Sequence, residues 1–420
     1  MRRPDYNRRV VVTGLGVVSS VGNDVDTVWS NLVAGCSGLA PITRFDASGY
    51  PANAAGEVKG FDVREWMDWK AARRTGLNVH FGVAAAKQAL ADSGIQVTPE
   101  NRDDLGIIFA SGAGEPKLMM ENKEIWDTKG ARLVSPFFIA NMLVDTASGQ
   151  IAIETGIRGH NMAIVTACST GTHSIGEAAE AIRRGDCTAI IAGSTESPIY
   201  EMVWIGFGNM RGIGTPRPGE GIETISRPFD ATRNGFILGE GAAALVIEDL
   251  EIAKARGARI YAEVVGYGST NDAWDLIQPI EGGDGVARAM EMAIQRRDVP
   301  RNEIDMINPH GTSTPVGDLA EAVAMYRVFG DRVKDVSVSA TKSMTGHMMG
   351  AAGAFEGLAT VLSVYHQTVP PTINYRDRDP EIDLNIPTQA VKKPIRYAMS
   401  SNVGLGGHNG AVIFKRYDGE

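Results

Sequence analysis

A short stretch near the middle of the chain joins an apolar run to a helix through a cysteine. Residues 163–166 (AIVT) lead to Cys168, and small residues follow it. Further on, apolar residues recur with the i, i+3, i+4, i+7 spacing of one helix face. These residues are Ile175, Ala178, Ala179 and Ile182. We therefore expect a strand, a turn at Cys168 and then a helix, which is the alternation typical of an α/β fold.

A cysteine at the start of a helix is a candidate nucleophile. Free backbone amides and the positive end of the helix dipole stabilise a thiolate, and the thiolate is the reactive form. A buried structural cysteine is the commoner fate of a lone Cys, so this stretch alone leaves both interpretations open. The chain has three cysteines, Cys36, Cys168 and Cys187, without zinc-like spacing. Their pattern predicts a reduced, cytoplasmic protein with no metal site.

Composition narrows the class of protein further. The 420 residues are enough for one large core or two fused domains. Lysine and arginine total 41 against 50 acidic residues, and the net charge of −9 argues against nucleic acid as a partner. The basic N-terminus lacks the apolar core of a signal peptide. Since no run of 18 apolar residues occurs, we expect no membrane span.

The order of strands and polar turns repeats along the chain. A predicted strand at residues 105–110 is followed by a glycine-rich turn, and a strand at residues 304–308 is followed by His310. The strand–Cys168–helix unit is matched by a strand at residues 336–340, a polar turn and a helix. We therefore predict an α/β protein of two similar halves with largely parallel sheets. The predicted domains are residues 1–250 and residues 251–420.

The first predicted strand opens the chain. Residues 10–12 (VVV) are apolar and β-branched, which is typical of a buried strand. Gly14 and Gly16 follow within a few residues, and we expect them to form a turn.

Three segments of the second half end strands with polar residues. They carry His310, then Lys342 with His347, and then Asn402 ahead of the glycine-rich residues 404–407. Taken singly, each has an ordinary explanation: a hydrogen-bonded histidine, a solvated lysine, a turn. A metal site at the two histidines is conceivable, but no ligand spacing supports zinc.

Together these segments resemble the elongating β-ketoacyl-[acyl-carrier-protein] synthases of the second type, the condensing enzymes of fatty-acid synthesis. An ordered set of motifs carries the resemblance over nearly the whole chain. The motifs lie at residues 11–16 (VTGLG with its preceding Val), 166–171 (TACSTG), 226–230 (SRPFD), 235–241 (GFILGEG), 309–315 (PHGTSTP), 341–347 (TKSMTGH) and 404–409 (GLGGHN).

The resemblance implies a fold and a reaction. The fold is thiolase-like, with two pseudo-symmetric βαβαβαββ halves in layers of helices and sheets. The enzyme is an acyltransferase that condenses an acyl-enzyme thioester with malonyl-[acyl-carrier-protein], releases CO2 and yields 3-oxoacyl-[acyl-carrier-protein] in fatty-acid elongation. It needs no cofactor, because loss of CO2 drives the C–C bond. The partners implied are the acyl and malonyl forms of the acyl carrier protein and a second copy of the chain.

The resemblance also implies the residues of the site. Cys168 is the nucleophile, His310 and His347 donate to the developing enolate oxygen, and Lys342 supports them electrostatically. The backbone N–H groups of Cys168 and Leu405 form the oxyanion hole. The substrate-binding residues implied are Thr312 and Thr314 on the pantetheine arm, Ala113 at the acyl tunnel, and Val403 and Leu405 at the gate.

Several positions depart from the family pattern. Val403 and Leu405 are aliphatic where many members have phenylalanine, and Ala113 lies where a larger aliphatic residue is common. Asp275 lies where a histidine is frequent, and residues 400–402 read Ser-Ser-Asn where Ser-Asn-Ser is the common order. These departures concern chain length and gating and leave the Cys-His-His set intact.

Three other functions share parts of this pattern. A ketosynthase of polyketide or specialised lipid assembly would share the fold and chemistry. A non-catalytic partner subunit would lack the cysteine, and a thiolase would carry a second cysteine late in the chain, whereas none follows Cys187. For the elongating enzyme, we expect the acidic carrier protein to dock near the basic residues Lys70, Arg73 and Arg74, because opposite charges steer association.

Overall fold

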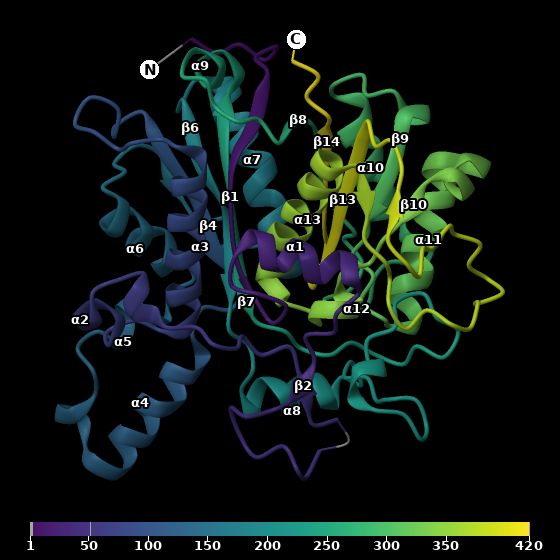
Figure 1. Cartoon of the computed structure of the whole chain (residues 1–420). Coiled ribbons are helices and arrows are strands. Elements are labelled where there is room, and N and C mark those ends of the chain that lie inside the picture. The colour runs from purple at the N-terminus through teal and green to yellow at the C-terminus, as the bar shows by residue number, and fades with distance from the viewer. Residues whose placement is uncertain (1–2, 51, 420) are drawn as a thin grey trace.

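Ten strands form one mixed sheet in the computed structural model, which describes residues 3–50 and 52–419 (Figure 1). Their order across the sheet is β10-β9-β13-β14-β8-β1-β7-β6-β4-β5. The strands are β1 Val10–Ser19, β4 Leu105–Ser111, β5 Asn161–Met162, β6 Ala189–Glu196, β7 Gly241–Asp249, β8 Ala262–Asn271, β9 Ile304–Asn308, β10 Ser337–Val338, β13 Tyr397–Gly404 and β14 His408–Lys415.

The sheet divides into two matching halves at the junction of β1 and β8. Moving outward from it, the first half runs β1-β7-β6-β4-β5 and the second runs β8-β14-β13-β9-β10. In both halves the first two pairings are antiparallel and the last two are parallel. A short antiparallel contact at Val11 and Val12 joins the halves. This arrangement confirms the predicted α/β fold of two pseudo-symmetric halves; the domain boundary at residue 250 stays a prediction. The prediction of a largely parallel sheet was wrong, because five of the nine pairings within the described sheet are antiparallel and four are parallel.

Helices fill three layers around the strands. α7 and α13 pack against each other between the two halves of the sheet, α3 and α6 cover the outer face of the first half, and α10 and α11 cover the second (Figure 1). No helix in the described part of the chain is both long and apolar enough to cross a membrane. These helices are α3 Leu77–Ser93, α6 Thr146–Thr155, α7 Thr170–Arg184, α10 Asp284–Gln295, α11 Pro315–Phe329 and α13 Ala352–His366.

Smaller elements lie around the edges of these layers. β2 pairs with β3 and β11 pairs with β12 in two-stranded sheets. The remaining elements are α1 Val25–Ala34, α2 Trp69–Ala72, α4 Pro116–Lys129, α5 Phe138–Met142, α8 Glu201–Asn209, α9 Leu250–Ala255, α12 Lys342–Thr345, β2 Ala40–Pro41, β3 Ala54–Ala55, β11 Thr368–Val369 and β12 Val391–Lys392.

Two local predictions were wrong. β1 continues through Gly14 and Gly16 instead of turning there. A Cβ atom at Gly14 would lie 2.2 Å from the carbonyl oxygen of Ala89, and one at Gly16 would lie 2.0 Å from that of Ala85. These glycines therefore let α3 pack directly on the strand backbone.

The strand predicted at residues 163–166 is also absent. The chain leaves the sheet after β5, whose bounds are Asn161–Met162, and then crosses towards the middle of the molecule without regular structure. β4 continues to Ser111, but the Ser111 N–H donates to the Val144 oxygen, so residues 163–166 do not extend the pairing of β5 with β4. The predicted helix after Cys168 is present as α7.

Candidate active site

Cys168 lies in a tight turn that feeds directly into α7. A 3₁₀ turn, Ala167–Ser169, precedes the helix, and Ala167 has a φ of 51°, a conformation that non-glycine residues rarely adopt. The turn between β13 and β14 presses on this segment from the other half of the molecule. A Cβ atom at Gly404 would lie 2.5 Å from the Thr166 oxygen and 3.2 Å from the Cys168 nitrogen. Only a glycine permits this backbone-to-backbone approach at the cysteine.

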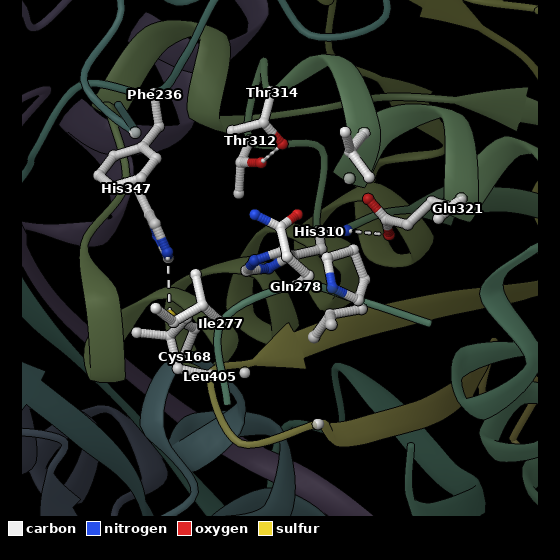
Figure 2. A pocket seen from close by; sticks show the side chains of 18 of the residues that line it. Cys168, Phe236, Ile277, Gln278, His310, Thr312, Thr314, Glu321, His347 and Leu405 are labelled. Carbon is white, nitrogen blue, oxygen red and sulfur yellow. Dashed lines mark hydrogen bonds between the residues drawn. The ribbon is translucent and has the colours of Figure 1, made fainter. Parts of the chain in front are cut away.

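Two histidines of the second half meet the cysteine. His310 follows β9 and His347 follows α12. The Nε2 atom of His347 lies 3.1 Å from the Cys168 Sγ, and the two imidazole rings are 5.1 Å apart at 85° to each other (Figure 2). One donor atom from each of the three residues lies within 4.8 Å of the others. The structure thus brings together three residues predicted from distant parts of the sequence. The same spacing would suit a metal ion, and the absence of a metal site stays a prediction.

Burial changes the expected protonation of the cysteine. Its side chain is 4% exposed, and burial raises the pKa of the Cys168 thiol to about 12. The positive charge of Lys342 and a hydrogen bond from the Leu405 N–H act in the opposite direction but do not outweigh it. The sequence led us to expect a stabilised thiolate; at neutral pH the structure instead favours the thiol. The sulfur must therefore lose its proton as it attacks, and the His347 ring in contact with it stays neutral.

Both histidines are neutral near pH 7. Burial lowers the pKa of His310 and of His347 well below the ordinary value, and the nearby charge of Lys342 lowers both further. Lys342 itself is buried and forms an ion pair with Glu356. Its Nζ atom also lies 3.4 Å from the Nδ1 atom of His310. Neutral imidazoles can donate one N–H each towards an oxygen in the cavity.

An apolar cavity runs from the cysteine to the surface. Thr312 and Thr314 line it and share a hydrogen bond of 3.0 Å, and Val403 and Leu405 line it as well (Figure 2). Ala113 does not line this cavity, and its side chain is exposed. Four of the five predicted substrate-binding residues thus share one cavity. Its other lining residues include Phe207, Met210, Phe236, Ile277, Gln278 and Val316.

Two family models of known proteins match consecutive parts of the chain. Residues 7–253 match the family model "Beta-ketoacyl synthase, N-terminal domain", and residues 261–376 match "Beta-ketoacyl synthase, C-terminal domain". The chain belongs to the β-ketoacyl synthase family. The family resemblance noted in the sequence is thereby confirmed.

Relatives and solved structures agree with this assignment. The chain is 44% identical to 3-oxoacyl-[acyl-carrier-protein] synthase 2 of Staphylococcus aureus (strain COL) over 98% of its length and 99% of the relative's. It is 44% identical to the enzyme of the same name from Vibrio harveyi, over 97% and 99%. The ishigamide ketosynthase/chain length factor matches with a TM-score of 0.90 and 35% identity, covering 98% of this chain and 99% of that one. A type II PKS acyl-carrier protein in complex with its ketosynthase, bound to the hexaketide, matches with a TM-score of 0.89 and 30% identity, covering 99% and 100%.

The structure of this β-ketoacyl synthase adds buried carboxylates that sequence reasoning missed. Glu321 of α11 accepts hydrogen bonds from the backbone N–H groups of His310 and Gly311, and burial raises the pKa of Glu321 to about 8. Glu356 of α13 pairs with Lys342. A signal for Glu356 was present in the sequence, because it is the one charged residue within the apolar stretch 352–364.

Proposed function

We propose that this chain catalyses a decarboxylative Claisen condensation, the elongation step of fatty-acid synthesis. One observation carries the proposal: a buried cysteine in contact with one neutral histidine and close to a second. The enzyme is an acyltransferase of the ketoacyl synthase type. The reaction turns an acyl-enzyme thioester and malonyl-[acyl-carrier-protein] into 3-oxoacyl-[acyl-carrier-protein], CO2 and free carrier protein.

In the first half-reaction, the Cys168 sulfur attacks the thioester carbonyl of an acyl carrier protein. As the new C–S bond forms and the old one breaks, the thiol proton ends on the pantetheine sulfur, and the carrier protein leaves as its free thiol. The backbone N–H groups of Cys168 and Leu405 stabilise the tetrahedral oxyanion. The hydrogen bond from the Leu405 N–H to the sulfur supports this role, because it shows that amide directed at the reacting residue.

In the second half-reaction, malonyl-[acyl-carrier-protein] enters the same cavity and loses CO2. The electron pair left by the broken C–C bond forms an enolate, whose oxygen accepts hydrogen bonds from His310 and His347. The enolate carbon then attacks the acyl carbonyl, and the Cys168 sulfur leaves. Neutral histidines suit this step, because they donate without placing a second positive charge beside Lys342.

The cavity supports the substrate assignment. Thr312 and Thr314 offer hydroxyl groups to the amide-bearing pantetheine arm, and the apolar lining suits its thioester end. Val403 and Leu405 act as an aliphatic gate beside the cysteine. Lys342 lowers the cost of negative charge on the sulfur and the enolate.

The partner of the site is an acyl carrier protein. A carrier protein in complex with its ketosynthase is among the structural relatives. Lys70, Arg73 and Arg74 on and after α2 are exposed, as a docking surface for an acidic partner requires. We place the carrier protein there.

We also propose that the enzyme is a cytoplasmic homodimer. Exposed apolar side chains gather in α4, α5 and the segments around β5, which forms one edge of the sheet. Exposed apolar side chains next to an open strand edge favour a partner that covers them. A second copy of the chain would cover the side chains and pair with the strand edge. The exposed residues are Met119, Met120, Trp126, Leu133, Phe137, Ile139, Leu143, Ile153, Met162 and Val165.

One experiment tests the reaction and its nucleophile together. The protein is incubated with acyl-carrier protein, then with malonyl-carrier protein, and products and peptides are analysed by mass spectrometry. We expect an acyl adduct on Cys168 and a 3-oxoacyl product two carbons longer. An adduct on Cys36 or Cys187, or condensation by Cys168→Ala, would contradict the assignment. A preference for polyketide-type starters would favour the specialised ketosynthase instead; the 44% identity to the synthase 2 enzymes favours fatty-acid elongation.

A further inference from the structure

Asn402 is a fully buried amide between the two halves of the active site. It lies in β13 at a position where serine is common in the family pattern described above, and its side chain is 0% exposed. The amide contacts three polar groups. The Oδ1 atom accepts a hydrogen bond from the Thr172 hydroxyl of α7, and the Nδ2 atom lies 2.7 Å from the Glu356 Oε2 and 3.2 Å from the His310 Nδ1.

These contacts set the orientation of the amide. A rotation by 180° would place the Oδ1 atom against the Glu356 carboxylate, where two acceptors would face each other. In the observed orientation the Thr172 hydroxyl donates to the amide oxygen, and the carboxylate accepts from the amide nitrogen. The second N–H of the same nitrogen is then directed to His310.

The orientation of Asn402 determines which nitrogen of His310 carries the proton. The Nδ1 atom is near two donors, the Asn402 amide and the Lys342 ammonium. Neither group can accept a hydrogen bond, so Nδ1 must be unprotonated. The proton of the neutral ring therefore resides on Nε2, the nitrogen left for the cavity that His310 lines.

Lys342 alone is a weaker restraint on the ring. Its ammonium forms the shorter contact with Glu356 and lies 3.4 Å from the ring nitrogen, beyond the usual hydrogen-bond range. The Asn402 amide is closer to the ring, and its own position is fixed from both sides. A serine at this position has a shorter side chain with one O–H, so it cannot serve Glu356 and His310 at once.

We propose that Asn402 is a positioning residue that holds His310 in the Nε2–H tautomer, directed at the thioester oxygen of the malonyl substrate. This inference rests on the proposed function and assigns the position a role specific to this chain. The condensation step depends on it, because the enolate oxygen needs the His310 proton. Acylation of Cys168 does not, since the cysteine contacts His347 rather than His310.

The test replaces the amide by an isosteric carboxylate in Asn402→Asp. The new oxygen faces both the Glu356 carboxyl and His310 Nδ1, so the two carboxyl groups share one proton. The new carboxyl also accepts from His310, so the ring donates from Nδ1 and loses its Nε2 proton. We expect the condensation kcat to fall on the order of a hundredfold or more, in line with the loss of one oxyanion donor. Acylation of Cys168, measured separately by mass spectrometry, should stay within about threefold of wild type. In protein with ¹⁵N-labelled histidine, the Nδ1 resonance of His310 should move from the unprotonated to the protonated position.

Two further variants sharpen the test. Asn402→Ser removes the nearer donor and leaves only the Lys342 ammonium, so we expect a smaller loss of condensation than in the Asp variant and a partial shift of the His310 resonances towards the other tautomer. Asn101→Asp is the control, since Asn101 is half-buried, lies outside the active site and the proposed dimer surface, and makes its side-chain hydrogen bonds to backbone groups. It should leave condensation and the His310 resonances unchanged.

Two results would overturn the inference. Equal losses of acylation and condensation in Asn402→Asp would indicate a general role in folding. An unchanged tautomer together with unchanged condensation would show that the amide does not control the ring. The resonances of His310 can be measured without substrate. The tautomer test therefore still gives a result if the protein does not catalyse the proposed condensation, and the two failures can be told apart.

Discussion

The two helices at the centre of the molecule begin in the same way but carry different chemistry. α7 follows the 3₁₀ turn Ala167–Ser169, and α13 follows the 3₁₀ turn Met349–Ala351. The first residue of each turn has a positive φ, 51° at Ala167 and 47° at Met349, and each helix has 15 residues. The second residue of the first turn is Cys168, and that of the second turn is Gly350.

The difference follows from the space available at each turn. The Cys168 side chain opens into the cavity. A Cβ atom at Gly350 would lie 2.5 Å from both the Glu196 Oε2 and the Gly112 nitrogen, so no side chain fits. The Gly350 N–H instead donates to the Glu196 carboxylate at 3.0 Å. The same backbone arrangement thus presents a nucleophile in one half and a backbone donor in the other.

The loops after the equivalent strands β4 and β9 show a related contrast. After β4, the N–H groups of Gly112 and Ala113 donate to the buried Glu196. After β9, the N–H groups of His310 and Gly311 donate to the buried Glu321. Each loop is held by a buried carboxyl group, yet only the second loop carries a side chain that reaches the cysteine. The two halves therefore place these loops in equivalent positions through the same backbone arrangement. The side chains differ, and only those of the second loop take part in the proposed reaction.

Substitution at the two equivalent turn positions should separate chemistry from stability. Cys168→Ala removes the nucleophile, so acylation and condensation should fall by about 10³-fold or more, while the free energy of unfolding changes little. Gly350→Ala forces overlap with Glu196 and Gly112 and should cost about 1–3 kcal/mol of stability. Urea denaturation and single-turnover acylation measure the two effects.

A third alanine variant serves as the control. Gly149 lies in α6, and among the described residues outside its own helix turn no atom lies within 4 Å of the place that a Cβ atom would take there. Gly149→Ala should therefore stabilise the helix by about 0.5–1 kcal/mol. A Gly350→Ala protein as stable as wild type would mean that the second turn is not constrained as described.

The sequence predicted the candidate residues that the fold brings together, because these residues have distinctive types in local motifs; their roles stay a prediction. Cys168, His310, Lys342 and His347 each lie at a turn that the pattern of strands and helices marks. The sequence did not predict that Gly350 occupies the turn position equivalent to Cys168, because this equivalence depends on backbone torsion angles and not on residue type. The expected thiolate was wrong for a similar reason: burial is a property of the assembled halves and not of the helix start.

The two buried carboxylates should differ in their effect on stability with pH. Burial raises the pKa of Glu196 to about 7 and that of Glu321 to about 8, from an ordinary 4.5. Above pH 4.5 the folded state keeps a proton that the unfolded state has lost, so the free energy of unfolding falls as pH rises towards each folded pKa. For Glu196 the total fall is about 3 kcal/mol.

Urea denaturation from pH 5 to pH 8.5 distinguishes the two groups. Glu196→Gln should flatten the decline below pH 7, and Glu321→Gln should flatten it up to pH 8. Between pH 7 and pH 8, only the second variant should differ in slope from wild type. Identical slopes for both variants and wild type would show that neither group holds its proton in the folded state.

The proposed docking site lies on the first half, so reversing surface charges there should affect carrier binding more than reversing a charge on the second half. Charge reversal in Arg73→Glu/Arg74→Glu removes two favourable contacts with an acidic carrier, so the KM for carrier-bound substrate should rise on the order of tenfold. The increase should shrink in high salt, because ions screen exposed charges. Lys392→Glu, on an exposed strand of the second half, reverses one charge; it is compared with the single change Arg73→Glu and should leave the KM unchanged. Equal effects of both changes would indicate only general charge attraction.

The smallest predicted effect is a change in acyl-chain preference at Ala113, which lies in the loop of the first half that corresponds to the His310 loop of the second. Its side chain is exposed in the single chain, and the next residue, Gly114, lies against the carbonyl oxygen of Met142 in α5. This places Ala113 beside the apolar residues that we propose a second copy covers, so an acyl tunnel that includes Ala113 is completed only in the dimer. Ala113→Ile would then shorten the tunnel.

Each methylene excluded from the tunnel costs the substrate about 0.8 kcal/mol of burial. This corresponds to a factor of about four in preference per methylene. A primer series from short to long acyl chains, run with the parent, with Ala113→Ile and with the exposed control Ala255→Ile in α9, measures the shift in kcat/KM. We expect the Ala113 variant alone to lose long primers. If kcat/KM depended on primer length in the same way in all three proteins, Ala113 would not be a substrate-binding residue. The first half would then contribute the nucleophile, and the second half would form the cavity beside it.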